Sequence, residues 1–89
     1  MQNLNRMTDS AKIKNWVASM VGKSRYELQA VEPLSLHDSR EVAADVYDDF
    51  LLFWVGDAAA PCVSVPIDTL TPSNVPTIAA KIERFAALN

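Results

Sequence analysis

Three stretches of the chain repeat their apolar residues with the period of an α-helix. Between Ser10 and Val21 the apolar positions follow i, i+3, i+4, i+7 and i+8, with lysines on the opposite side, which predicts an amphipathic helix. Between Ser39 and Val55, seven apolar residues fall within one broad face at 100° per residue: Val42, Ala43, Val46, Tyr47, Phe50, Phe53 and Trp54. The residues from Thr77 to Ala87 follow the same period. The pattern therefore predicts three main helices.

Irregular connections separate these helices. Lys23–His37 and Val55–Thr69 lack a sustained period and contain prolines, so we read both as loops, the first with apolar side chains pinned across the core. Val63–Ile67 alternates weakly, but its proline and the lack of a partner strand argue against a sheet. A short helical turn is expected at Pro72–Val75, and Pro76 should separate it from the last helix. The sequence thus predicts an all-α fold: a right-handed bundle of three main helices plus one short helix.

Length and composition predict one small domain. The chain has 89 residues, of which 49% are hydrophobic and 21% charged, as in soluble globular proteins. Residues 1–9 read as a flexible tail and residues 10–89 as a single domain. No apolar run approaches a membrane span, and the N-terminus lacks the apolar segment of a secretion signal. The lone cysteine, Cys62, cannot form an internal disulfide. We therefore expect a cytoplasmic monomer.

Charge is unevenly distributed along the chain. Residues 31–89 carry nine acidic and three basic side chains, which argues against a nucleic-acid binder and suits a basic protein partner. Four carboxylates fall at i, i+4, i+7 and i+8 on the predicted second helix, opposite its apolar face: Glu41, Asp45, Asp48 and Asp49. Neighbouring carboxylates in such a stripe repel one another slightly, and this cost favours a functional role for the stripe. Solubility is the competing interpretation.

The start of the predicted second helix carries candidate chemistry. Asp38 can cap the helix, and Glu41 three residues later completes a pattern like a capping box. Ser39 then lies in the first turn, where its hydroxyl stays at the surface. The positive end of the helix dipole would favour a phosphodiester attached there.

The order of these features resembles the acyl and peptidyl carrier proteins of fatty-acid, polyketide and nonribosomal-peptide synthesis. The resemblance covers the chain from about Ile13 to Phe85. It is carried by a first helix, IKNWVASMVG, by the segment VEPLSL before the Asp-Ser pair, and by LTPSNVPTIAAKI, which is similar to the third and fourth helices of carriers.

The resemblance implies a function for Ser39. A phosphopantetheinyl transferase would attach 4'-phosphopantetheine from coenzyme A to this serine, and the arm would carry an acyl or aminoacyl thioester. The protein itself would not be an enzyme. Acyl- or aminoacyl-transferring synthase enzymes would dock on it through basic patches. The partner-binding residues would be Arg40, Glu41, Val42, Asp45, Val46, Asp48 and Asp49.

Several features depart from the carrier pattern. Arg40 stands where carriers have leucine, the usual Leu-Gly pair before the motif is missing, and the connection from Trp54 to Leu70 is long. Arg40 and the shortened lead-in favour an alternative: an unmodified, carrier-like helical module that binds proteins through its acidic second helix. A thiol nucleophile built from Cys62, His37 and Asp38 has no supporting motif, and one histidine and one cysteine do not define a metal site.

Overall fold

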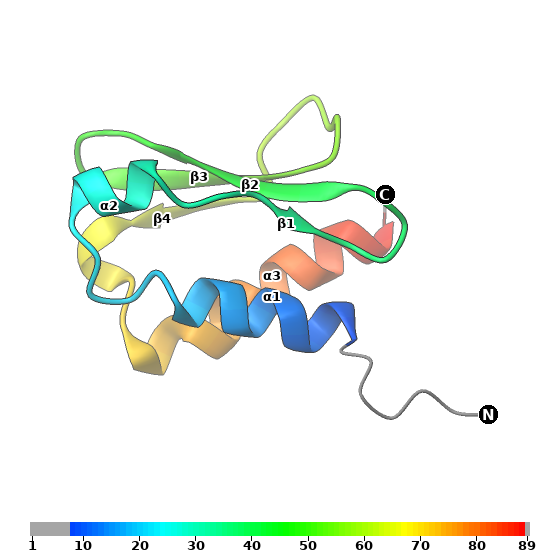
Figure 1. Ribbon diagram of the computed structural model, residues 1–89, viewed down its shortest axis with the longest axis horizontal. Helices are drawn as coiled ribbons and strands as arrows, with labels where there is room; N and C mark the ends of the chain where they lie inside the picture. Colours follow the sequence, from blue (N-terminus) through cyan, green and yellow to red (C-terminus); the bar gives the residue numbers. More distant parts are fainter. Residues whose placement is uncertain (1–7, 89) are drawn as a thin grey trace.

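A four-stranded antiparallel sheet and two longer helices form two layers (Figure 1). The computed structural model describes residues 8–88. The helices α1 and α3 pack on each other and against one face of the sheet, whose strand order is β1-β2-β3-β4. In chain order the elements are α1 (Asp9–Ala18), α2 (Arg25–Gln29), β1 (Leu34–Ser35), β2 (Glu41–Val46), β3 (Phe50–Val55), β4 (Val63–Pro66), 3-10 turns at Ile67–Thr69 and Pro72–Asn74, and α3 (Val75–Leu88).

The predicted all-α helical bundle is wrong. The predicted second helix, Ser39–Val55, is instead the hairpin of β2 and β3, in which Val42 pairs with Val55 and Val46 with Leu51. The segment is rich in β-branched and aromatic residues, which suit a pleated, half-buried surface. Two consecutive aspartates form the turn between the strands. Its closing bond runs from the N–H of Tyr47 to the carbonyl of Phe50, at 2.9 Å.

The two predicted connections also contain regular structure. The first holds α2 and the short strand β1. Ser24 begins α2 with a complete capping box, in which its hydroxyl accepts from the N–H of Glu27 and the Glu27 carboxylate accepts from the N–H of Ser24. The expectation that this segment is pinned across the core holds for Leu28 and Leu36, which are buried. The second connection contains β4, against our prediction, and Pro66 ends it at the edge of the sheet, where strands tolerate proline.

The first and last helices are confirmed, with shifted ends. Thr8 caps α1, which ends at Ala18, before the positive-φ residue Gly22. The short helical turn at Pro72–Asn74 is also present. Pro76, however, does not break the chain between this turn and the last helix. It lies in the first turn of α3, where no intrahelical bond needs its missing N–H.

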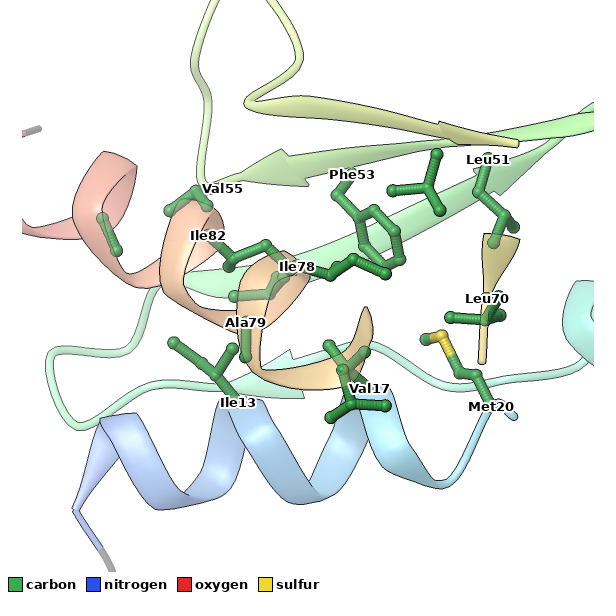
Figure 2. Packing of buried hydrophobic residues seen from close by; sticks show 14 of the residues in the cluster. Ile13, Val17, Met20, Leu51, Phe53, Val55, Leu70, Ile78, Ala79 and Ile82 are labelled. Atoms are coloured by element: carbon green, nitrogen blue, oxygen red, sulfur yellow. The ribbon is translucent and has the colours of Figure 1, made fainter. Parts of the chain in front are cut away.

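The core lies between the sheet and the helix pair. Figure 2 shows α1 and α3 side chains that meet inward-facing residues of β3. Phe53 is fully buried there, and Trp16 contacts its ring edge-on with centroids 5.7 Å apart. The buried set comprises Ile13, Val17, Met20, Leu28, Leu36, Val42, Leu51, Phe53, Val55, Val65, Leu70, Val75, Ile78, Ala79, Ile82 and Ala86. Among the helices of residues 8–88, none is long and apolar enough to cross a membrane.

Candidate functional site

Ser39 lies at the tip of the β1–β2 hairpin and not in a helix. Its side chain is exposed, its φ is +75°, and its N–H donates to the carbonyl of Leu36 at 3.1 Å. Asp38 is therefore not a helix cap. Its carboxylate accepts from the backbone N–H of Arg40 at 3.1 Å, which closes a tight turn of the kind aspartate favours. The helix dipole expected behind Ser39 is absent from the hairpin tip.

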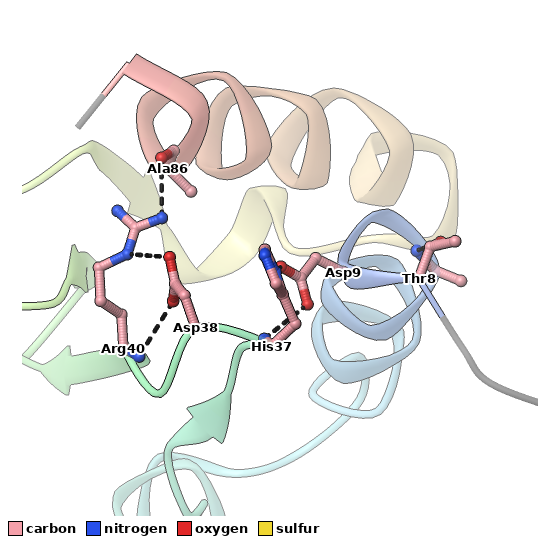
Figure 3. Close-up of polar contacts among 7 residues, drawn as sticks. Thr8, Asp9, His37, Asp38, Arg40 and Ala86 are labelled. Atoms are coloured by element: carbon pink, nitrogen blue, oxygen red, sulfur yellow. Dashed lines mark hydrogen bonds and ion pairs between the residues drawn. The ribbon is translucent and has the colours of Figure 1, made fainter.

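Residues on either side of Ser39 hold the hairpin tip to both long helices (Figure 3). The Arg40 guanidinium donates through Nε to Asp38 at 2.9 Å and through Nη2 to the carbonyl of Ala86, in the last turn of α3, at 3.0 Å. His37 contacts the Asp9 carboxylate at the start of α1 through its backbone N–H, at 3.0 Å, and through its ring Nδ1. The residue that departs from the carrier motif, Arg40, thus binds the C-terminal end of a helix, where a cation is favourable.

Electrostatics around Ser39 do not favour an added anion. Ser39 borders an open hollow of about 650 Å³, together with Asp38, Arg40, Glu41 and Asp57. Three of these neighbours are carboxylates, and the Arg40 guanidinium already binds Asp38. The backbone hydrogen bond from Arg40, assisted by its guanidinium, lowers the pKa of Asp38, so this carboxylate keeps its negative charge. A phosphodiester on Ser39 would lie among like charges.

The hairpin distributes the predicted docking residues over three places. Val42 is fully buried, and Val46 packs against the core, so both face the helices. Glu41 and Asp45 are exposed on the opposite face of β2. The remaining acidic residues, Asp48 and Asp49, form the β2–β3 turn, where Asp48 binds Arg25 of α2 at 3.1 Å. A single acidic stripe does not exist.

The face of the sheet away from the helices is apolar along its central strand. Burial alternates strictly along β3, so that Phe50, Leu52 and Trp54 are half-buried and lie outside the core cluster. The register puts Leu52 beside Asp45 and Trp54 beside Ala43. We call Glu41, Ala43, Asp45, Tyr47, Phe50, Leu52 and Trp54 the outer face. An antiparallel sheet normally presents polar residues on its solvated side, so this apolar column is unusual.

Two aromatic groups complete the outer face. Tyr47, which is 45% exposed, stacks on Phe50 with centroids 4.8 Å apart and planes at 11°. The indole N–H of Trp54 is buried without a hydrogen-bond partner, the one such side-chain atom among the described residues. The other indole, that of Trp16, donates to the carbonyl of Glu32 at 3.0 Å. A buried donor without a partner carries a desolvation cost, which the indole of Trp16 avoids through its bond to Glu32.

The thiol and the histidine have separate partners. The Cys62 thiol donates to the carbonyl of Phe53 at 3.3 Å, and burial raises its pKa, which is opposite to what a nucleophilic thiol needs. His37 is engaged with Asp9. Within residues 8–88, no group of three or more potential metal ligands comes together.

Sequence reasoning missed the outer face because it placed Phe50 and Trp54 on the apolar face of a predicted helix. One signal could have revealed it: the run FLLFWV has six apolar residues, between an Asp-Asp pair and a Gly-Asp pair, which is typical of a short strand. Comparisons with protein-family models, curated proteins and solved structures gave no match.

Proposed function

We propose that this domain is a non-catalytic docking module that binds a basic partner protein through the outer face of its sheet. One observation carries the proposal. The column of Phe50, Leu52 and Trp54 lies apart from the core, beside the exposed carboxylates of Glu41 and Asp45. Contiguous apolar surface bordered by polar residues is typical of interaction sites.

Charge indicates the kind of partner. The carboxylates of Glu41 and Asp45 are exposed, and the chain carries a net charge of −3. Docking a second acidic surface would bring like charges together, which costs binding energy. A surface with lysines or arginines around an apolar centre would complement both parts of the outer face. We thus propose for Glu41 and Asp45 the docking role expected from the sequence, on a strand instead of a helix.

The experiment uses a photo-crosslinking amino acid placed at Leu52 in the native host, with the same amino acid at Lys14, on α1, as the matched control. Mass spectrometry identifies any protein joined at position 52 and not at position 14. That protein is then purified, and its affinity for wild type and for Leu52→Asp and Asp45→Lys is measured at low and high salt. We expect weaker binding by both variants and weaker binding in salt. Equal affinity for all three proteins would refute the proposal.

A carrier role for Ser39 stays a prediction, and a specific observation keeps it testable: the serine is exposed at the end of a hairpin. The carrier hypothesis predicts that coenzyme A, Mg²⁺ and a broad-specificity phosphopantetheinyl transferase add the mass of one arm to the wild type and not to Ser39→Ala. The docking proposal needs no modification. An unmodified wild type, both in this assay and when purified from its native host, would remove the carrier function and leave the docking proposal intact.

A further inference from the structure

The geometry points to an α-helix as the segment that occupies the outer face: we infer an amphipathic helix of the partner, apolar at i, i+4 and i+8, with lysines or arginines along one flank. This inference rests on the proposed docking function and specifies its partner.

The edges of the sheet leave little room for a partner strand. At one edge, β1 pairs only with Glu41 and Val42 of β2, and α2 also packs against β2. At the other edge, the N–H of Ile67 donates to the carbonyl of Asp49 of the neighbouring chain segment. Because alternate residues of a strand direct their backbone groups to the same side, those of Ser64 and Pro66 point away from β3. Pro66 has no N–H, and its carbonyl already accepts from the Thr69 hydroxyl at 2.8 Å. Within β4, Ser64 alone offers backbone groups to a new strand, which favours a partner that lies across the face.

A partner segment that lies across the face must satisfy its own backbone. The side chains of Phe50, Leu52 and Trp54 offer the segment no partners for its N–H and carbonyl groups, apart from the buried indole N–H. An extended chain pressed against them would leave polar backbone groups unpaired, which is costly. A helix has already paired these groups internally. The apolar column therefore favours a helix over an extended peptide.

The dimensions also match. Phe50 and Trp54 are four residues apart on one strand, or about 13 Å. Side chains at i and i+8 of a helix are about 12 Å apart along its axis. Glu41 and Asp45 form a row of the same length on the neighbouring strand, about 5 Å to the side. The register shifts this row by two residues, so that Asp45 lies beside Leu52 and Glu41 lies beside Gly56, just beyond Trp54. A helix along β3 would thus place three apolar side chains on the column and direct one flank toward the two carboxylates.

The test is a titration of the full chain with three synthetic peptides of about 18 residues, long enough for a helix. The first has leucines at i, i+4 and i+8 and lysines along one flank. The second has the same composition with leucine and lysine alternating. The third replaces the lysines of the first with glutamates. The chain supplies its own reporters, because its two tryptophans give separate indole N–H signals in NMR spectra. Trp54 lies on the outer face, whereas Trp16 faces the core.

We expect the first peptide to move the Trp54 indole signal and leave that of Trp16 in place, with the second and third peptides at least tenfold weaker. Leu52→Asp should abolish the shift. Asp45→Lys, which changes an exposed side chain and should leave the fold intact, should weaken binding about fivefold. Glu83→Lys, on α3, has the same charge change away from the sheet and should bind like wild type.

Equal binding of the alternating peptide, shifts confined to the helical layer, or no binding of the first peptide would overturn the inference. Sedimentation of the protein alone tests whether a second copy of the chain occupies the outer face. A dimer that Leu52→Asp abolishes would also overturn the inference. These failures are distinct from failure of the docking function. A crosslinked partner that depends on Leu52 but binds through a strand or a folded surface would end the helix inference and keep the proposed function.

Discussion

Replacing Arg40 with leucine, the residue that carriers have at this position, should release the hairpin tip from α3. The side chain of Arg40 runs along Gly56, where an added Cβ would come within 3.3 Å of Arg40 Cδ, and ends on the carbonyl of Ala86. A leucine would keep the first part of this packing and lose the guanidinium. The carbonyl at the end of the helix would then lack its charged donor.

The expected loss of stability is about 2 kcal/mol. A hydrogen bond from a charged group contributes about 1.5–3 kcal/mol, and partial exposure of Arg40 favours the lower half of this range. The favourable position of a cation at a helix C-terminus, about 0.3–1 kcal/mol when exposed, acts through the same carbonyl, so we do not add it to this range. We assign nothing to the exposed pair with Asp38. In a domain of this size, such a loss should lower the Tm by about 8–16 °C.

Urea unfolding followed by circular dichroism measures this loss, and Arg84→Leu is the matched control. Arg84 is an exposed arginine on the same helix, and its replacement should change stability by less than about 0.5 kcal/mol. Hydrogen exchange should also quicken at the last turn of α3 in Arg40→Leu, more than elsewhere in the helix. Equal stability of the two variants, or uniformly faster exchange, would refute the interpretation of Arg40 as the clamp on α3.

Two further variants test the hairpin tip. Ser39→Gly should stabilise the fold by about 1 kcal/mol, because a non-glycine residue at positive φ is strained; a lower urea midpoint would contradict this. The hydrogen bond from His37 lowers the pKa of Asp9 below its ordinary value of 3.8. The stability that this bond adds is therefore complete above pH 3.8 and is lost as the pH falls through the lowered pKa. Below pH 4 the urea midpoint should fall more steeply for wild type than for Asp9→Asn, and parallel curves would show that the contact is unimportant.

The first and last helices could be predicted from the sequence because the spacing of their apolar residues fits a helix and not a strand. In α1, Ile13 and Val17 are buried four residues apart, and in α3 Val75, Ile78 and Ile82 are buried at spacings of three and four. Residues separated by an odd number, such as i and i+3 or i+7, lie on opposite faces of a strand, so their burial together identifies a helix. The predicted break at Pro76 is wrong because this proline lies in the first turn of α3, where a helix tolerates it.

The middle of the chain could not be predicted in this way because its spacing is ambiguous. Glu41 and Asp45 are four residues apart, which is about one helical turn and also two full strand periods. They share a face in either structure. The positions that would decide between the two, Asp48 and Asp49, form the turn itself. Their spacing from Glu41 continued the helical pattern by coincidence, and the deciding cross-strand partners, such as Val65 of β4, are distant in sequence.

The replacement of the predicted helix by a hairpin accounts for both halves of the candidate site. In a helix, Val42, Val46, Phe50 and Trp54 would share one buried face. In the hairpin, the pairing of Val46 with Leu51 makes even-numbered residues of β2 and odd-numbered residues of β3 face the helices together. Phe50 and Trp54 therefore move to the outer face, while the helix that would have supported an anion on Ser39 disappears. The hairpin thus has two consequences. It weakens the physical case for a phosphopantetheine arm, and it creates the apolar column on which the docking proposal rests.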